Sequence, residues 1–278
     1  MVRLIVSFMV FVVAAVVLLS PLVITGAGAQ GAKQTVESGK RYPRLVIRNA
    51  MVIDGNGTPA SGPFDIVVEN NTIAEIVGLD PVAVKSGTAR RPAGDVEIDA
   101  TGKYAMPGLI NAHGHVQEER GGVPQPLDYE LKLWLACGIT TVRDLGSNIK
   151  RTLALRQASA AGEVAAPRLF VYAVYAAGGA PRTAEAARQR VRDLKAQGVD
   201  GLKMFAMDRD LMAAAWDEAR KTGLRIAHHA AIAETNAWDD IKFGTTTIEH
   251  WYGIPDAAIE SGVQNFPPAY NYNDEVDR

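Results

Sequence analysis

The sequence predicts an α/β protein whose main part is a partial (β/α)8 TIM-type barrel of about six strands, preceded by a small β-sandwich domain. Three observations support this prediction. Before residue 100, short strand-like segments are separated by turns. After it, apolar strands alternate with amphipathic stretches of helix length, which is typical of a parallel βα array. All five histidines fall at the ends of predicted strands, and the carboxyl ends of barrel strands form one face.

The composition fits a medium-sized globular protein. The chain has 278 residues, 47% of them hydrophobic, and a net charge of -2. The 29 lysines and arginines nearly balance the 31 aspartates and glutamates, and no basic run with interleaved aromatic residues is present. This excludes a nucleic-acid partner and a polybasic membrane-binding surface. A single cysteine excludes an internal disulfide, so stability must come from an ordinary core.

Residues 1–29 have the pattern of a secretory signal peptide. Arg3 precedes an uncharged apolar run over 4–24, and Ala27 and Ala29 supply the small residues of a cleavage site. The alternative is an uncleaved membrane anchor, because the apolar run approaches the roughly 20 residues that a spanning helix needs. In both cases we expect a secreted or periplasmic protein that contacts a membrane only through this segment.

Residues 30–100 form the predicted small β domain. We expect short strands over 45–47, 51–53, 65–68 and 73–77, with a turn at 54–57 and a polar hairpin connection at 69–72.

Residues 101–252 contain the first six units of the predicted barrel. We expect strands over 104–115, 138–144, 168–174, 201–205, 225–229 and 245–250, and helices over 127–136, 149–161, 183–197, 209–222 and 232–243. A doubly wound open sheet is the competing architecture, but the glycine-rich phosphate turn expected after its first strand is missing. Residues 253–278 show neither a helical nor a strand periodicity and contain two adjacent prolines, so an irregular tail is expected. Two more βα units would be needed to close the barrel.

His113 and His115 are the first candidate metal ligands. Because they are two apart on a strand, they project to the same face and can share one ion. The alternative is a pair of histidines hydrogen-bonded in the core or on a loop, since this spacing alone is a weak pattern. The apolar strand that delivers both imidazoles at its end favours a metal site.

Three later strands add further candidates. Lys203 lies in the apolar segment 201–205, where a charged amine is not buried without a partner or a chemical change, unless it extends to the barrel mouth. A neutral lysine there could be carbamylated and bridge two metals. His228 and His229 end the fifth strand and point to opposite sides of it, so one of them is the ligand. His250 ends the sixth strand, and its alternative role is to cap the following turn.

Four separated segments resemble signature strands of one enzyme family. Residues 98–115 resemble the entry to the barrel in the amidohydrolase superfamily. Residues 138–146, 201–205 and 247–250 resemble later strands of its imidazolonepropionase and prolidase-like branch. The resemblance covers nearly all of 45–252. It implies a metal-dependent hydrolase barrel with a composite small β domain, and we expect the chain to be shortened at its C-terminus.

The resemblance also implies roles for single residues. One metal would be bound by His113 and His115 and the other by His229 and His250, with Lys203 bridging both as a carbamate. Lys203 and His229 would also be the catalytic residues.

The resemblance also guides the interpretation of three further residues. His229 is preferred over His228 because the Val-x-x-His-Ala frame of the family is matched by residues 226–230. Arg143 and Asp144 match the family as well, and we interpret them as a structural ion pair beneath the site.

The function implied by the resemblance is hydrolysis of carbon–nitrogen bonds in a non-peptide amide, cyclic amide or dipeptide by a hydroxide activated between two metal ions. The cofactors would be two divalent ions. Zinc is preferred, although manganese, iron or cobalt also suit imidazole and oxygen ligands. The partner is a small-molecule amide or dipeptide substrate, and no oligomeric state is predicted. The alternatives are a mononuclear metal-dependent deaminase of the same superfamily and an inactive truncated metal-binding protein.

One ligand of the family has no counterpart. The family draws an aspartate from the end of the eighth strand, where it also moves a proton to the leaving group. Asp256, Asp274 and Asp277 follow the sixth predicted strand, but none of them ends an apolar strand. We therefore expect a fragment of a longer gene product, because a partial barrel exposes apolar surface and strand edges. The alternatives are a decayed enzyme and a partner that supplies the rest.

Overall fold

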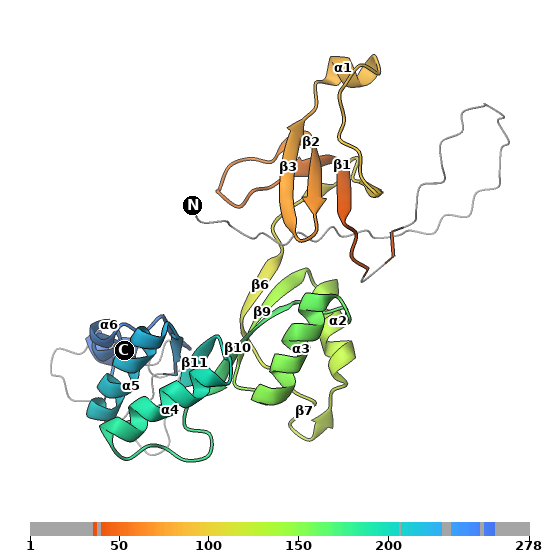
Figure 1. Ribbon diagram of the computed structural model, residues 1–278. Coiled ribbons are helices and arrows are strands. Elements are labelled where there is room, and N and C mark those ends of the chain that lie inside the picture. The colour runs from red at the N-terminus through yellow and green to blue at the C-terminus, as the bar shows by residue number, and fades with distance from the viewer. Residues whose placement is uncertain (1–35, 38–39, 206, 230–234, 251–252, 259–278) are drawn as a thin grey trace. The chain divides into compact units, whose positions relative to one another are not determined.

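The computed structural model describes residues 36–37, 40–205, 207–229, 235–250 and 253–258 (Figure 1). The predicted signal peptide lies outside these residues, as do most of the predicted tail and the predicted helix start at 232–234. No helix within the described ranges is long and apolar enough to cross a membrane. The described residues fall into two compact units.

The first unit contains an N-terminal sheet. Its strands are β1 (Arg44–Val52), β2 (Ser61–Glu69), β3 (Thr72–Gly78), β4 (Val96–Asp99) and β5 (Tyr104–Ala105), and the short helix α1 (Pro81–Lys85) follows β3. The order is β3-β2-β1-β4, and β5 also pairs with β1. Figure 1 labels β1, β2 and β3 of this sheet. The pairs β1–β2 and β2–β3 are antiparallel, while β4 and β5 run parallel to β1.

The sequence places most of this sheet correctly. The predicted hairpin at 69–72 is confirmed, because Glu69 pairs with Thr72 and Asn70 adopts a φ of 55°, which asparagine tolerates. The predicted strands 45–47 and 51–53 are one strand, β1. Its register with β2 shifts after Ile47, next to Asn49 with a φ of 59°.

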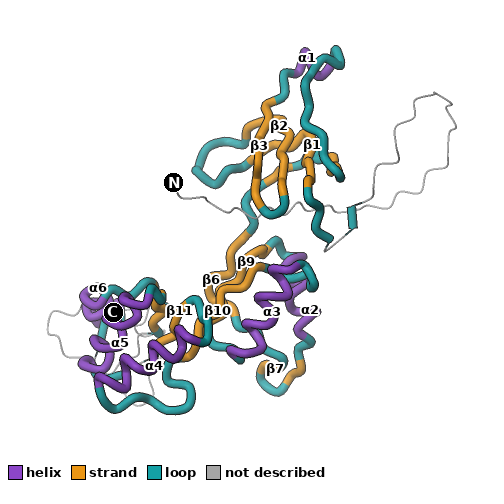
Figure 2. The backbone as a smooth tube through the Cα atoms, viewed as in Figure 1, coloured by secondary structure: helices purple, strands orange, loops and turns teal. Residues whose placement is uncertain are grey.

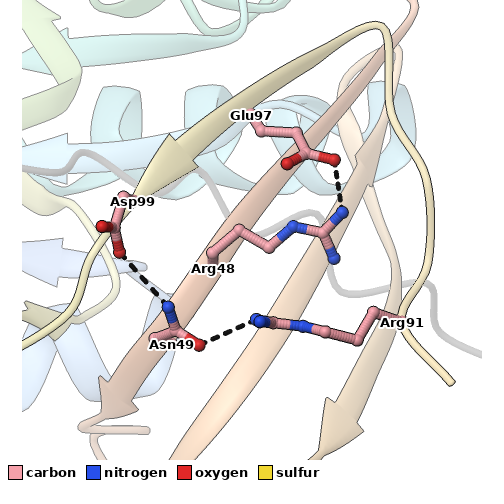
Figure 3. Close-up of a pocket in the computed structure, with 5 residues that line it drawn as sticks. All are labelled: Arg48, Asn49, Arg91, Glu97 and Asp99. Atoms are coloured by element: carbon pink, nitrogen blue, oxygen red, sulfur yellow. Dashed lines mark hydrogen bonds and ion pairs between the residues drawn. The ribbon is translucent and has the colours of Figure 1, made fainter. Parts of the chain in front are cut away.

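A buried carboxylate on β2 forms hydrogen bonds with residues of other segments of this unit. Asp65 on β2 is fully buried and accepts hydrogen bonds from Arg48 (2.8 Å), Arg91 (2.5 Å) and the backbone N–H of Asn49 (3.1 Å). Arg48 also pairs with Glu97, and Arg91 donates to the Asn49 side chain (Figure 3). Burial alone would raise the pKa of Asp65, but the hydrogen bonds from Arg91 and Arg48 hold it below its ordinary value. We call Asp65, Arg48, Arg91 and Asn49 the Asp65 cluster.

The barrel part follows the predicted order of strands and helices (Figure 2), but the predicted strand 104–115 is two strands: β5 pairs with β1 of the N-terminal sheet, and β6 belongs to the barrel sheet. Its strands are β6 (Leu109–Gly114), β9 (Ile139–Leu145), β10 (Arg168–Val174), β11 (Gly201–Met204), β12 (Arg225–His228) and β13 (Thr247–Ile248). The helices are α2 (Leu127–Ala136), α3 (Ile149–Ala161), α4 (Ala184–Ala196), α5 (Arg209–Thr222), α6 (Ala237–Phe243) and α7 (Ile254–Ala258); β7 (Glu119–Arg120) and β8 (Val123–Pro124) form a small hairpin. The sheet order is β13-β12-β11-β10-β9-β6, so sequence neighbours are sheet neighbours. The predicted fold class is confirmed: a curled, parallel half-barrel follows a strand-rich N-terminal region.

Amphipathic helices pack on the later strands of this sheet. The core joins buried side chains of α4 and α5 to those of β10, β11 and β12, among them Val191, Leu194, Trp216, Leu202 and Ile226. Burying side chains of this size stabilises the fold by about 1.5–3 kcal/mol each. Gly223, with a φ of 70°, ends α5 as a left-handed cap. The predicted helix 232–243 starts later in the described residues, at Ala237, because Asn236 caps it.

Candidate metal centre

Four imidazoles meet at the carboxyl ends of three strands. The ring centroids of His113 and His115 are 5.4 Å apart, those of His113 and His250 4.4 Å, and those of His229 and His250 4.8 Å. His113 ends β6, while His229 and His250 follow β12 and β13. Since β6 and β13 are opposite edges of the sheet, its curl is what brings these side chains together. We call these four residues the histidine cluster.

Lys203 on β11 has the environment that its sequence predicts. Its exposed fraction is 2%, and its Nζ has no hydrogen-bond partner among the described residues. The Nζ lies 5.6 Å from the centroid of the Phe205 ring. Burial lowers the pKa of Lys203 to about 8, with Glu249 opposing this shift and Arg143 adding to it. About one tenth of this amine is therefore neutral at pH 7, far more than for an ordinary lysine.

The histidine cluster is held in its neutral, electron-donating form. Burial lowers the pKa of all four imidazoles, and the charge of Lys203 lowers each one further. The pKa of His229 falls to about 4. The buried Nδ1 of His115 has no hydrogen-bond partner among the described residues. Neutral imidazole is the form that binds metal ions.

The structure separates His228 from His229. His228 is fully buried, with its Nδ1 2.7 Å from Asp240 and its ring edge-on to Trp216 at 5.2 Å. Thr245 donates to Asp240 and accepts from the Trp216 indole. Successive side chains of a strand point to opposite faces, so His228 faces this buried network while His229 joins the histidine cluster.

The predicted ion pair between Arg143 and Asp144 is wrong. Both residues lie on β9, and adjacent side chains of a strand point in opposite directions. Asp144 instead accepts hydrogen bonds from the backbone N–H of Val116 (3.2 Å) and the hydroxyl of Ser147 (2.5 Å). Arg143 forms its ion pair with Glu249, at 2.6 Å.

Glu249 is a site residue that the sequence reasoning missed. Its Oε2 lies 2.6 Å from His113 Nδ1, and its Oε1 accepts hydrogen bonds from Arg143 (2.6 Å) and Thr247 (2.7 Å). Burial would raise the pKa of Glu249, but the hydrogen bond from Thr247 and the charge of Arg143 lower it overall. A carboxylate directly before a candidate ligand, in Thr247-Ile248-Glu249-His250, was the available signal.

His250 occupies a strained backbone position. Its φ is 64°, in the left-handed region that residues other than glycine rarely adopt. Such residues concentrate at functional sites, where the surrounding structure holds them in place. The strain also ends the predicted strand 245–250 early, although Glu249 N–H still donates to the His228 carbonyl at 2.8 Å.

The donor chemistry of the cluster fits a divalent metal. Within the described ranges, no three or more His, Cys, Asp or Glu side chains are arranged as they would be around an ion. The cluster nevertheless combines neutral imidazoles with two buried nitrogens, on His115 and Lys203, that have no hydrogen-bond partner in the described part of the chain. Buried polar atoms of this kind are normally satisfied, and a metal ion is the partner that several imidazole nitrogens share.

Comparisons with solved structures support the same fold. A Bifidobacterium longum protein described as a prolidase superposes with a TM-score of 0.60 at 27% identity, covering 76% of this chain and 55% of its own. A structure described as phenylurea hydrolase B has a TM-score of 0.60 at 19% identity, covering 75% of this chain and 59% of its own, and shows the fold alone.

Sequence comparisons cover shorter segments. A 5-methylthioadenosine/S-adenosylhomocysteine deaminase of Desulforudis audaxviator (strain MP104C) is 43% identical over 72 residues, which are 26% of this chain and 15% of the relative. A dihydroorotase of Thermoanaerobacter sp. (strain X514) is 35% identical over 75 residues, which are 27% of this chain and 15% of that relative. The matches thus span a small part of these relatives.

A family model covers more of the chain. The model of the amidohydrolase family matches residues 104–262, more than half of the sequence, from β5 through the histidine cluster. This chain therefore belongs to the amidohydrolase family.

Proposed function

We propose that this chain carries the metal centre of an enzyme that hydrolyses carbon–nitrogen bonds in small molecules. One observation carries the proposal: Lys203 is buried without a hydrogen-bond partner among the described residues, and it perturbs the pKa of all four imidazoles of the histidine cluster. A cation placed among neutral imidazoles has no structural benefit there. A site that exchanges this cation for a metal-bridging anion explains the arrangement.

The residues divide into two pairs and a bridge. His113 and His115 would hold one divalent ion, His229 and His250 the other, with zinc preferred for these ligands. Two such ions lower the pKa of water and polarise a carbonyl oxygen. Lys203 supplies the bridge: its neutral amine attacks carbon dioxide, an N–C bond forms, and one proton leaves to solvent. A pKa of about 8 makes this amine far more available near pH 7 than an ordinary lysine.

The names of the relatives support a proposal for the substrate class. The names prolidase, phenylurea hydrolase, dihydroorotase and deaminase all describe attack at carbon–nitrogen bonds of small molecules. We infer a non-peptide amide, a cyclic amide or a dipeptide as substrate. The apolar N-terminal segment supports a secreted or periplasmic location for this activity.

A mononuclear deaminase is the second candidate. It is favoured by the match to the Desulforudis deaminase, the highest identity among the relatives above. A deaminase with one ion would not need a bridging lysine. The products separate the two candidates, because a deaminase releases ammonia from a base, whereas an amide hydrolase yields an amine and an acid, which remain in one ring-opened product when the amide is cyclic.

The test uses the full-length gene product. We expect about two zinc ions per chain by mass spectrometry. We also expect hydrolysis of at least one member of a panel containing an Xaa-Pro dipeptide, dihydroorotate and an N-acyl amino acid. Lys203→Ala should lose at least one ion and more than about 100-fold in kcat/KM, since even a residue that only orients a ligand contributes 10–100-fold.

Lys132→Ala is the matched control. Lys132 lies on α2 with 62% of its side chain exposed, so this variant should keep both ions and full activity. A Lys203→Ala enzyme that retains both ions and full activity would remove the bridging role. Ammonia release from 5-methylthioadenosine with one ion per chain would favour the deaminase instead.

A further inference from the structure

Both carboxylate oxygens of Glu249 are engaged. Glu249 is 5% exposed, and one oxygen lies 2.6 Å from His113 Nδ1. The other accepts hydrogen bonds from Arg143 and from the hydroxyl of Thr247. Glu249 therefore contacts a candidate metal ligand without being one.

Arg143 fixes the orientation of this carboxylate. Its Nε donates to the Ala112 carbonyl (2.6 Å), and its other nitrogens donate to Thr247 (2.9 Å) and Glu249 (2.6 Å). The guanidinium also lies 5.4 Å from the centroid of the Tyr172 ring. Arginine has only donors, so the oxygen that faces it must accept. The second oxygen is left for His113.

We propose that Glu249 is a positioning residue that fixes His113 as its Nδ1–H tautomer and so presents the Nε2 electron pair of His113 to the metal centre. An ionised carboxylate can only accept hydrogen bonds, so the proton between the two groups belongs to Nδ1. Neutral imidazole has one N–H, which leaves Nε2 as the donor atom. The metal in this statement rests on the proposed function, whereas the tautomer does not.

The same contacts connect the two edges of the half-barrel. His113 lies on β6 and Glu249 follows β13, and these strands are not hydrogen-bonded neighbours in the sheet. Arg143 contacts Ala112 on one edge strand and Thr247 on the other. Glu249 directly precedes His250, so this network also holds the rings of His113 and His250 at their 4.4 Å separation.

The tautomer is measurable in the metal-free chain. Long-range 15N–1H correlation spectra of 15N-histidine-labelled protein distinguish the two tautomers, and the signals that disappear in His113→Gln identify His113. We expect a protonated Nδ1 and an unprotonated Nε2. An Nε2–H tautomer at His113 would overturn the proposal, whatever the metal content of the protein.

Glu249→Gln tests the role of the carboxylate. The amide oxygen should face Arg143 and Thr247, which places the amide NH2 against His113 Nδ1. His113 must then accept there and carry its proton on Nε2, which removes the lone pair. We expect the tautomer to flip and the zinc affinity to fall by about 10–100-fold, the usual cost of losing such a partner.

A double variant separates positioning from structural damage. In Glu249→Gln with Arg143→Met, the amide is free to turn its oxygen toward His113, so the Nδ1–H tautomer and part of the zinc affinity should return. Glu75→Gln, which changes an exposed carboxylate on β3 outside this network, should change neither. A Glu249→Gln chain with parental tautomer and zinc affinity would refute the role. If the parent binds no zinc, the proposed function fails while the tautomer still decides this inference.

Discussion

Asp65 in the N-terminal sheet and Lys203 in the half-barrel are both buried ionisable residues on apolar strands, yet their surroundings are opposite. Asp65 is fully buried and accepts hydrogen bonds from Arg48, Arg91 and the Asn49 backbone. Lys203 is 2% exposed, and its amine has no hydrogen-bond partner in the described residues. Asp65 is thus fully paired, and Figure 3 shows the further contacts of its partners, Arg48 with Glu97 and Arg91 with Asn49. Burial alone therefore does not identify a functional charge, whereas a buried charge without a hydrogen-bond partner is a candidate for one.

The two regions also differ in what removal of the charge should do. Breaking a buried, satisfied pair leaves its partners uncompensated and is strongly destabilising. Removing a buried group that has no partner relieves a desolvation cost. Removing the charge of Asp65 should thus lower the stability of the fold. Removing the charge of Lys203 should raise the stability and impair the function.

The largest expected effect is on the Asp65 cluster. Asp65→Asn should lower the free energy of unfolding by about 3 kcal/mol, because Arg48 and Arg91 lose their charged acceptor. Chemical denaturation followed by circular dichroism measures this. Glu75→Gln, which changes an exposed carboxylate on β3 of the same sheet, is the matched control and should stay within about 0.5 kcal/mol of the parent. Equal stability of the two variants would show that the Asp65 cluster is not structural.

Lys203→Met should act in the opposite direction. Methionine is similar in length and apolar, so the metal-free variant should be about 1–2 kcal/mol more stable than the metal-free parent. The same denaturation curves measure it, with Lys132→Met as the exposed control. A clear loss of stability would mean that Lys203 has a structural partner, and the contrast with Asp65 would disappear.

A smaller effect on the free energy of unfolding is expected at low pH. The folded-state pKa of Asp65 lies below the ordinary value of 3.8, so its stabilisation is complete above that value and is lost as the pH falls through the folded-state pKa. Between pH 5 and pH 3 the parent should therefore lose more unfolding free energy than Asp65→Asn. The difference is smaller than that caused by the substitution, because part of Asp65 remains ionised at pH 3. Parallel pH dependences of the two proteins would contradict the lowered pKa.

Local patterns predicted the half-barrel well. The bounds of α2, α3 and α5 agree with those read from the sequence, because periodicity and caps are local signals. The last strand is shorter than predicted, since the left-handed backbone of His250 depends on its surroundings. Strand alternation shows only that one of His228 and His229 faces the site, and the preference for His229 rests on the family resemblance of residues 226–230. Lys203 is indicated by its apolar context.

Contacts across the sheet could not be predicted in this way. The pairing of Arg143 with Glu249 joins residues 106 apart in sequence and depends on the curl of the sheet. Without that information, the sequence predicts the adjacent Asp144 as the partner of Arg143. Asp65, like Lys203, is a charged residue within an apolar strand, so the same signal was present in its sequence. The partners of Asp65 lie on other segments of the chain, so the sequence does not show that this charge is paired.

Unfolding of the parent and of Lys203→Met, each with and without zinc, tests the central claim most directly. We expect the order of stability to reverse: the variant is the more stable without zinc. At zinc concentrations about 100 times the dissociation constant, zinc should raise the free energy of unfolding of the parent by about 2.7 kcal/mol and that of the variant by clearly less. If zinc stabilises neither protein, or both equally, Lys203 and the histidine cluster are not the metal centre proposed for this chain.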